Sequence, residues 1–410
     1  MDTLKVRDAK DVEQAVRDAI AAEQPLEIIG HGTKRNIGQP MATNALLDVS
    51  ALNAVTLYEP NELVLTVQCG APMADVLSLI DSKNQQFAFE PMDTSLLLGT
   101  PRGAGTIGGI VSAGLAGPRR IKAGGARDHL LGFNGVSGFG DSFKAGGRVV
   151  KNVTGYDLCK LLAGSWGTLS VMTEMTLKVM PKAESERTLI MHGLDDIAAG
   201  RAMIAALGSS YDVSAAAHFP ASKHRDEIAA LKDIGASGGG LTLIRLEGIG
   251  ASVLDRAKSL RKELLSFGQV GLIEDVLSSD VWAAIRDVAI FSSNGPTGSW
   301  PVWRIVCPPA AGAAFGQALA RDTGGEVMYD WGGGLIWAAL PPSPDAYASM
   351  LRERLKGIEG HATLIRAADQ VRAAVDVFHP QQAGVAALGQ RVKASFDPKN
   401  ILNRGRMVRA

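Results

Sequence analysis

Apolar residues recur at the spacing of a helix near the start of the chain, over Ala9 to Glu23. Asp8 is suited to cap this helix, because an aspartate side chain accepts hydrogen bonds from N–H groups of the first turn. Pro25 ends the helical pattern, and the short apolar run Leu26 to Ile29 predicts a buried strand. The same reasoning predicts further strands over 46–49, 55–58 and 63–68 and a helix over 73–81.

Glycine interrupts the apolar pattern between Gly99 and Gly135, where 11 of 37 residues are glycine. Glycine costs conformational entropy, so this density needs a reason. With few side chains in the way, backbone N–H groups can approach phosphate oxygens directly. A flexible linker is the alternative, but the apolar residues between the glycines would bury poorly in one. The segment is therefore predicted to cradle a large phosphate-bearing cofactor, with positive charge supplied by Arg102, Arg119, Arg120, Lys122 and Arg127.

Alternation of apolar and polar residues at a period of two over Leu169 to Val179 predicts a strand that ends at Pro181. Before it, 133–144 and 147–150 indicate a hairpin or meander, and 156–163 a short helix. Beyond about residue 183, strands (188–191, 241–246, 302–307, 335–339) alternate with helices (197–207, 252–267, 279–288, 310–321, 344–356). This part predicts a second, α+β domain with an antiparallel sheet. A helix over 388–396 precedes a basic tail, which is expected to fold back onto the first domain.

The composition describes a globular chain with a substantial core: 410 residues, 46% hydrophobic and 20% charged, enough for two or three domains. A formal net charge of zero argues against a general nucleic-acid binder. Cys69, Cys159 and Cys307 are isolated, which suits a reducing compartment and excludes an iron–sulfur cluster held by this chain alone. The first ten residues are polar and charged, so no signal peptide is expected there. The sequence has no run of about 18 apolar residues, so no membrane-spanning segment is expected.

Residues 103–108 read Gly-Ala-Gly-Thr-Ile-Gly and match the glycine fingerprint of dinucleotide-binding folds, with Asp128 lying 20 residues beyond Gly108. That fingerprint requires a strand directly before it and a helix directly after it. Here Pro101 and Arg102 precede it, and further glycines follow. The dinucleotide-binding fold is therefore not favoured.

Four stretches taken together carry a more specific pattern: IIGHGTKRNIG at 28–38, TIGGIVSAGLAGPRR at 106–120, RDHLLGF at 127–133 and VVKNVTGYDLCKLLAGSWGTLSVMTEMTLKVMP at 149–181. In this order and spacing they resemble the PCMH-type FAD-binding domain of the vanillyl-alcohol oxidase superfamily over residues 1–182. The runs SAGLAGPRR and KNVTGYDLCKLLAGS resemble the FAD-binding subunit of bacterial glycolate oxidase, also called glycolate dehydrogenase. The ending FDPKNILNRGRM resembles the superfamily's C-terminal FDPxxxxNPGR, with Arg404 in place of the proline.

The resemblance implies an α+β protein: a FAD-binding domain of two α+β subdomains (1–182), an α+β cap domain with an antiparallel sheet (183–390), and a tail returning to the FAD domain (391–410). It implies that the FAD pyrophosphate meets the first loop, at Ile29, Gly30, His31, Gly32, Thr33, Lys34 and Gly38. The second half of the site would consist of Thr106, Gly108, Gly109, Ser112 and Gly117, with backbone contacts from Leu169 and Val171. A further family motif either serves the cofactor or pins the two halves of the domain together, through Lys151, Asn152, Tyr156 and Asp157.

Some members of the superfamily attach the flavin covalently through a histidine of the first loop, which makes His31 a candidate. The usual attachment pattern places that histidine after the paired glycines, where this chain has Thr33. FAD is therefore expected to bind non-covalently. His129, next to Asp128, is expected to be structural or exposed rather than a base.

Oxidation of a 2-hydroxy acid needs a cation for the carboxylate, a base for the hydroxyl proton and a flavin that accepts hydride. Arg304, on a predicted cap strand, is the candidate for the carboxylate; the alternative is a strand-edge arginine in a surface ion pair. The other histidines are scattered without metal-binding spacing, so no metal site is expected. The family's catalytic subunits carry a cap motif, HGDGNxH, that this sequence lacks.

A glycine turn flanked by Trp331 and Trp337 has three interpretations. It covers the flavin, forms a subunit contact, or is a hairpin whose tryptophans pack in the core. The last is slightly favoured.

The resemblance implies the FAD-binding subunit of a glycolate dehydrogenase complex, which converts glycolate or a similar 2-hydroxy acid to glyoxylate and passes electrons through FAD to an iron–sulfur subunit. A homologous FAD-binding catalytic subunit would carry the missing histidine cluster. The implied location is cytoplasmic, or peripheral to the inner membrane through the partners. Two alternatives stay open: a stand-alone FAD-dependent hydroxy-acid or alcohol oxidoreductase, and a non-catalytic relay or scaffold subunit.

Overall fold

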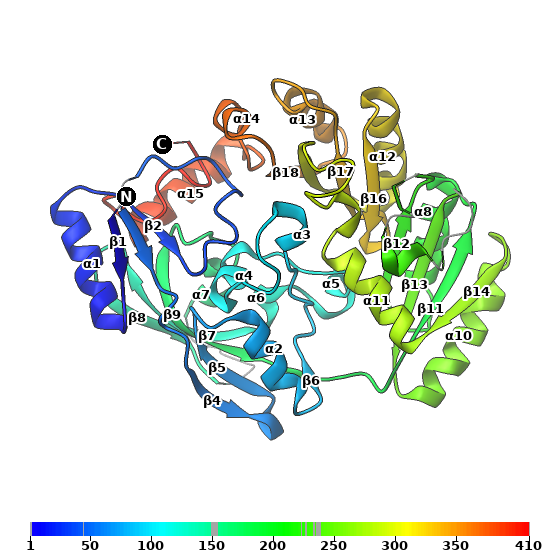
Figure 1. The fold of residues 1–410 in the computed structure, drawn as a ribbon, viewed down its shortest axis with the longest axis horizontal. Helices are drawn as coiled ribbons and strands as arrows, with labels where there is room; N and C mark the ends of the chain where they lie inside the picture. The colour runs from blue at the N-terminus through cyan, green and yellow to red at the C-terminus, as the bar shows by residue number, and fades with distance from the viewer. Residues whose placement is uncertain are drawn as a thin grey trace.

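The structure is a computed structural model that describes residues 2–43, 45–148, 155–222, 224–225, 228–232, 234 and 239–409. Figure 1 shows two bodies side by side, the first built from the N-terminal part of the chain and the second from the later part. The C-terminal segment returns to the first body. The predicted α+β architecture is confirmed, because each body combines helices with its own sheets.

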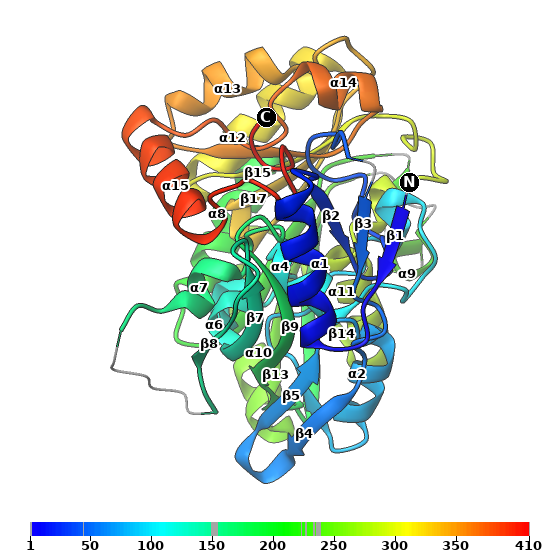
Figure 2. The same cartoon turned by 90° about the vertical axis from the view of Figure 1, so that its left-hand side faces the viewer.

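A three-stranded parallel sheet opens the first body, in the order β1 (Asp2–Lys5), β3 (Ala45–Asp48), β2 (Leu26–Ile29). Helix α1 (Ala9–Ala21) packs Val12 and Val16 into the same core as the strands. Figure 2 shows the helix lying beside this sheet. The predicted cap is confirmed, because the Asp8 carboxylate accepts the Asp11 N–H at 2.9 Å. This subdomain therefore follows directly from the apolar pattern of the first 50 residues.

The second half of the first body is a five-stranded antiparallel sheet. Its order is β4 (Val55–Glu59), β5 (Val64–Gln68), β9 (Ser170–Lys178), β7 (Leu130–Ser137), β8 (Ser142–Gly146). The predicted strands and the hairpin are confirmed, except that 147–148 are not in a strand and 149–150 lie outside the described residues. One hydrophobic cluster joins this sheet to α2 (Met73–Asp81), α4 (Ile107–Ala113), α6 (Ala126–His129) and α7 (Leu158–Leu162).

Helix α4 corrects one expectation about the glycine-rich segment. A helix does begin within the Gly103–Gly108 motif, at Ile107, and it is capped by Thr106, whose hydroxyl accepts the Gly109 N–H at 3.2 Å. No strand lies within residues 99–105, so the strand–turn–helix of a dinucleotide fold is still not present there. A helix with two glycines forms here because tight packing, not intrinsic propensity, holds it.

The second body is built on an eight-stranded antiparallel sheet. Its order is β14 (Val270–Glu274), β11 (Ser185–His192), β13 (Leu241–Gly248), β12 (Val213–Phe219), β16 (Glu326–Asp330), β17 (Leu335–Ala339), β15 (Val302–Val306), β18 (His361–Arg366). Four of these strands were not predicted: β12, β14, β16 and β18. All seven residues of β12 are buried, so this strand has no alternation of apolar and polar positions to detect.

Helices cover one face of this sheet: α8 (Asp196–Leu207), α10 (Gly250–Leu264), α12 (Pro309–Thr323) and α13 (Ala348–Lys356). The other face packs on α11 (Asp275–Arg286) and on apolar residues of the first body, among them Met92, Leu97 and Trp166. All five helices were predicted, with ends that differ by a few residues. A shared core therefore joins the two bodies.

A buried ion cluster also crosses this interface. The Arg245 guanidinium of β13 donates to both Glu90 oxygens, at 2.8 and 3.0 Å, while Arg119 donates to both Glu247 oxygens, at 3.0 and 2.6 Å. Burial alone would raise the pKa of Glu247, but the positive charges of Arg245 and Arg119 lower it to about 2. Each domain contributes an arginine and a glutamate to the cluster, and these also pair within each domain, Arg119 with Glu90 at 3.5 Å and Arg245 with Glu247 at 3.3 Å. Docking of the domains adds the shorter pairs between them.

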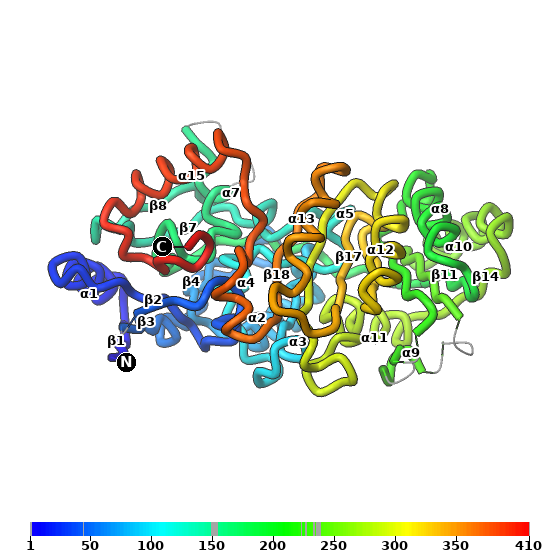
Figure 3. The backbone as a smooth tube through the Cα atoms, turned by 90° about the horizontal axis from the view of Figure 1, so that it is seen from above, coloured from blue at the N-terminus to red at the C-terminus, as the bar shows by residue number. Residues whose placement is uncertain are grey.

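The C-terminal segment leaves the second body through α14 (Asp369–Ala374) and α15 (Ala383–Phe396), which runs along the first body in Figure 3. The predicted terminal helix is confirmed and begins five residues earlier than the expected 388. After it, Leu402 pairs with Leu26 of β2, and the Leu26 N–H donates to the Ile401 carbonyl at 2.8 Å. The tail thereby lies along the free edge of the parallel sheet. None of the helices in the described ranges is both long and apolar enough to cross a membrane.

Candidate functional site

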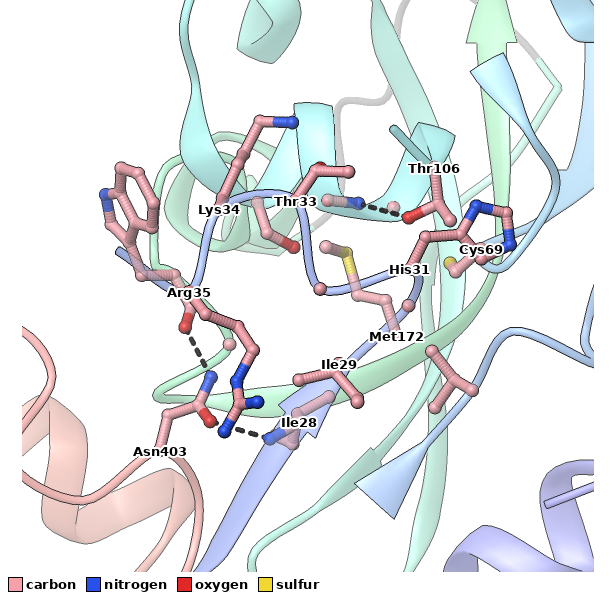
Figure 4. Close-up of a pocket in the computed structure, with 18 of the residues that line it drawn as sticks. Ile28, Ile29, His31, Thr33, Lys34, Arg35, Cys69, Thr106, Met172 and Asn403 are labelled. Atoms are coloured by element: carbon pink, nitrogen blue, oxygen red, sulfur yellow. Dashed lines mark hydrogen bonds between the residues drawn. The ribbon is translucent and has the colours of Figure 1, made fainter. Parts of the chain in front are cut away.

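A cleft lies where the loop after β2 meets the N-terminus of α4 (Figure 4). Its walls come from four stretches far apart in sequence: the β2 loop, α4, the start of β9 and the C-terminal tail. Ten of the predicted cofactor residues line it: Ile29, Gly30, His31, Gly32, Thr33, Lys34, Thr106, Gly108, Gly109 and Ser112. The structure therefore brings both predicted halves of the site together.

The loop after β2 presents unused hydrogen-bond donors. The backbone N–H groups of residues 31–34 donate to no other described residue, whereas the Arg35 N–H bonds back to the Gly32 carbonyl at 3.2 Å. Gly32 has a φ of +69°, which glycine adopts without strain and which turns the loop. Successive free N–H groups in such a turn form a concave anion-binding surface. This loop fits a pyrophosphate.

The two halves of the cleft touch at Gly30 and Thr106. A Cβ atom on Gly30 would lie 2.6 Å from the Thr106 hydroxyl oxygen and 2.8 Å from its methyl group. Gly30 is therefore needed for the close approach of the β2 loop to the capping residue of α4, apart from any contact with a ligand.

Gly108 and Gly109 line the cleft without offering it free donors. The Gly108 N–H donates to the Cys69 carbonyl at 2.9 Å, and the Gly109 N–H donates to the Thr106 hydroxyl. A Cβ on Gly108 would lie 2.6 Å from the same Cys69 oxygen. The sequence therefore placed these glycines at the site, but their local role in the structure is to let α4 press against the strand end.

Three lysine and arginine residues line the cleft, of which Arg35 is ion-paired with Glu27. Lys34 is 8% exposed, and burial lowers the pKa of its ammonium to about 8 despite the nearby Asp93 carboxylate. Arg406, from the tail, donates to the Lys34 carbonyl at 2.5 Å, and its own pKa falls to about 10 because of burial. The Lys34 and Arg406 side chains both lose hydration here, and a bound phosphate anion would offer each of them a charged acceptor.

Asn403 ties the tail to both halves of the site. Its Oδ1 accepts the Ile28 N–H at 2.8 Å, and its Nδ2 donates to the Trp166 carbonyl at 2.7 Å (Figure 4). Its φ of +42° is one that asparagine tolerates better than most residues. The sequence predicted the return of the tail, but gave no role to Asn403 or Arg406.

Further lining residues that the sequence did not single out come from the second half of the domain: Cys69, Trp166, Gly167, Ser170 and Met172. Leu169 and Val171, which were predicted, point instead into two separate cores. Because side chains of a strand alternate between its faces, the neighbours Ser170 and Met172 reach the cleft. The predicted backbone contacts of Leu169 and Val171 stay a prediction.

Gly38 and Gly117 also lie outside the cleft. The Gly38 carbonyl accepts a hydrogen bond from Arg372 at 2.8 Å. Gly117 is saturated at the domain interface: its N–H donates to the Glu90 carbonyl at 2.9 Å and its carbonyl accepts the Trp331 indole N–H at 3.1 Å. Both glycines therefore hold neighbouring segments in place around the site.

Two histidines of the first domain bond to backbone carbonyls. His31 Nδ1 lies 2.7 Å from the Ala104 carbonyl, which links the β2 loop to the glycine-rich segment. His129 is buried, and its Nε2 lies 2.9 Å from the Ala123 carbonyl. Because a carbonyl only accepts, each of these nitrogens carries the proton. Of the two alternatives expected for His129, structural or exposed, the structure shows the structural one.

Of the second family motif, Lys151 and Asn152 lie outside the described residues. Tyr156 is 93% exposed and contributes to neither core. The Asp157 carboxylate caps α7 by accepting the Lys160 N–H at 3.1 Å. Both predicted roles of this motif, serving the cofactor and pinning the two halves of the domain together, stay predictions.

Arg304 lies in the cap, away from the cleft. Its strand, β15, is paired on both sides, by β17 and β18, and no ion pair of Arg304 exists within the described ranges. The alternative of a strand-edge arginine in a surface ion pair is therefore wrong. Trp331 and Trp337 are 4% and 3% exposed at a β16–β17 hairpin, so the core-packing interpretation of the tryptophans is confirmed.

The three cysteines are buried free thiols, and burial raises their pKa values, for Cys159 and Cys307 to about 11. Among the described residues, no group of three or more histidine, cysteine, aspartate or glutamate side chains is arranged to hold a metal ion.

Comparison with known proteins identifies the cofactor. Residues 3–146 match the family model described as FAD binding domain. The structure superimposes on a crystal structure of p-cresol methylhydroxylase with a TM-score of 0.73, covering 99% of this chain and 88% of that one at 15% identity. It also matches alkyldihydroxyacetonephosphate synthase with a TM-score of 0.64, covering 98% of this chain and 75% of that one at 14% identity. The chain is thus an FAD-dependent oxidoreductase with the PCMH-type fold.

Particular relatives are found among curated proteins. The chain is 29% identical to glycolate oxidase subunit GlcE of Escherichia coli over 401 residues, which cover 96% of this chain and 95% of that one. It is 32% identical to glycolate oxidase subunit GlcD of Bacillus subtilis over 174 residues, which cover 42% of this chain and 35% of that one. The likeness to GlcE thus extends through the cap and the tail, and the likeness to GlcD is limited to a part of each chain.

Proposed function

We propose that this chain is the FAD-binding subunit of a glycolate dehydrogenase complex, which oxidises glycolate or a similar 2-hydroxy acid to the 2-oxo acid. The observation that carries the proposal is the similarity to glycolate oxidase subunit GlcE along 95% of that protein. The cleft adds the chemical support, because its free N–H groups and two cations suit a bound pyrophosphate.

In this proposal the N–H groups of residues 31–34, with Lys34 and Arg406, hold the FAD pyrophosphate. The binding is non-covalent: His31 Nδ1 is engaged by the Ala104 carbonyl, and Thr33 stands where the attachment histidine would be. When bound, FAD accepts a hydride from the carbon that bears the hydroxyl group. The residues of this chain position the cofactor and exclude water around its diphosphate.

The proposed partners are a homologous FAD-binding catalytic subunit and an iron–sulfur subunit, which receives the electrons. Two relatives with the printed names of glycolate oxidase subunits support a multi-subunit assembly. The proposed location is cytoplasmic, or peripheral to the inner membrane through these partners. A relay or scaffold role is the second candidate, favoured by the lack of the HGDGNxH motif in the sequence.

The decisive test is an anaerobic visible spectrum of the purified, FAD-loaded chain with glycolate and, separately, with D-lactate. Bleaching by glycolate without partners supports substrate oxidation by this chain. Reduction only after the partner subunits are added supports the relay role. A protein that cannot be loaded with FAD contradicts the proposal, as does a flavin that stays oxidised with glycolate and all partners present.

The affinity for FAD is expected to fall about tenfold between pH 7 and pH 9 in the wild-type chain. The pKa of Lys34 is about 8, below the ordinary value, so its ammonium loses its proton within this range and with it the attraction to the pyrophosphate. Replacing Lys34 by methionine should weaken binding at pH 7 and remove the pH dependence. Fluorescence titration of the apoprotein with FAD measures both effects.

Lys83→Met is the matched control, because Lys83 is an exposed lysine of the same domain, outside the cleft. This variant should keep the wild-type affinity and its decline with pH. An unchanged pH dependence in Lys34→Met would contradict the assignment of Lys34 to the pyrophosphate.

A further inference from the structure

Two arginines from different domains meet at one tryptophan ring. The guanidinium carbon of Arg120, in α5 (Arg120–Ala123) of the FAD domain, lies 4.5 Å from the centre of the Trp331 ring. That of Arg304, in β15 of the cap, lies 5.0 Å from it. In Figure 1, α5 reaches from the first body to the cap, where it contacts β12. The Trp331 indole thus holds a cation from each domain.

Neither guanidinium has a hydrogen-bonding or negatively charged partner among the residues that the structure describes. Within the described ranges, Arg120 and Arg304 form no hydrogen bond and no ion pair, although each carries five N–H donors. Arg119 and Arg245, a short way along the same interface, are both matched by glutamates. Glutamates therefore neutralise Arg119 and Arg245 at this interface, whereas Arg120 and Arg304 keep their N–H donors available to a ligand.

The groups around Arg304 supply little negative charge. Asp330 is the nearby acid, but its carboxylate accepts the Trp331 N–H at 2.7 Å and burial raises its pKa to about 7. His361, on the neighbouring strand, has its pKa lowered by burial and by the positive charges of Arg304, His379 and Arg120. Burial and the charge of Arg120 likewise lower the pKa of Arg304, to about 10. The cluster carries excess positive charge.

Like charges held close together in a partly buried place are costly unless an anion joins them. The planar fork of a guanidinium matches the two oxygens of a carboxylate, and contact with an indole face fixes the plane of the fork. The hydrogen bond from Trp331 to the Gly117 carbonyl anchors this ring to the FAD domain. An anion bound between the two guanidinium groups would thus be held by both domains at once.

We propose that Arg120 and Arg304 bind the carboxylate group of a small 2-hydroxy or 2-oxo acid, with Trp331 as the platform that positions both guanidinium groups. The choice of ligand class rests on the proposed function, while the anion site itself rests on the two open arginines. Arg120 is thereby assigned a role in ligand binding, and the site is complete only when the cap is docked.

The test is calorimetric titration of the FAD-loaded chain with oxalate, which has no hydroxyl-bearing carbon to oxidise. Wild-type protein should bind oxalate, and Arg304→Gln and Arg120→Gln should each weaken binding at least about tenfold. Arg120 is exposed, so its replacement is not expected to disturb folding even if that of Arg304 does. Arg127→Gln is the control, because Arg127 is an exposed arginine of α6, the helix that follows α5 in the chain. This variant should bind oxalate like wild type.

Failure of this inference is distinguishable from failure of the proposed function. The FAD content of each variant is read from its visible spectrum and should be unchanged. No binding of oxalate to the wild-type chain, wild-type affinity for oxalate in either arginine variant, or equally tight binding of uncharged glycolamide would overturn the carboxylate site. Oxalate binding that depends on both arginines in a chain whose flavin glycolate never reduces would leave the site standing and contradict the proposed oxidation.

Discussion

Replacing Gly108 by alanine is expected to lower the free energy of unfolding by about 3 kcal/mol or more and to impair FAD binding. The added Cβ would lie 2.6 Å from the Cys69 carbonyl oxygen and 2.7 Å from the Cys69 Cβ. Because the Gly108 N–H donates to that same oxygen, the helix cannot move away without losing the bond. Urea denaturation of the apoprotein and titration with FAD measure the two losses.

Gly105→Ala, within the same glycine motif, is the matched control. A Cβ there would have the Lys34 ammonium nitrogen as its nearest neighbour, at 3.5 Å, which is an ordinary contact. This variant should stay within about 0.5 kcal/mol of wild type. Equal losses in the two variants would show that the motif as a whole, and not the contact of Gly108 with Cys69, limits stability.

Replacing Asn403 by alanine is expected to destabilise the chain by about 3–5 kcal/mol and to weaken FAD binding at least about tenfold. The Ile28 N–H and the Trp166 carbonyl would both lose their partner, an asparagine side chain that is only 3% exposed. Alanine would also adopt the φ of +42° at a greater cost than asparagine. Thermal unfolding and the FAD dissociation constant report these effects separately.

Arg404→Ala controls for the sequence position, because Arg404 is exposed and adjacent to Asn403 in the tail. It should leave both stability and FAD affinity unchanged. If Asn403→Ala keeps the wild-type dissociation constant for FAD while losing stability, the tail braces the fold without shaping the cleft.

Much of the secondary structure could be read from local pattern. The helix over 73–81 and the strand over 26–29 have the predicted bounds, since both carry strong apolar periodicity and clear breaks. Local pattern did not predict elements that are completely buried or that are held in place by contacts with distant parts of the chain. Strand β12 is buried on both faces, and α4 contains glycines that a propensity argument reads as a loop.

The glycine-rich segment shows the same division within the site. Density of glycine predicted a phosphate-binding segment, and the family resemblance implied its pairing with the first loop. The structure does bring Gly30 and Thr106 close together. The sequence did not show which glycines offer donors and which permit close packing. That distinction depends on Cys69, whose carbonyl meets the Gly108 N–H.

By itself, the sequence predicted most of the helices and strands of the first domain, because periodicity and turn residues are properties of short segments. The FAD-binding domain and the two loop stretches of its cleft were implied by the resemblance of four sequence stretches to PCMH-type domains. Only the tertiary structure decided that Asn403 and Arg406 close that cleft, across separations of 375 and 372 residues. It also decided that Arg120 and Arg304 share one tryptophan. Contacts between residues so far apart depend on how the domains dock, and a local sequence pattern does not predict them.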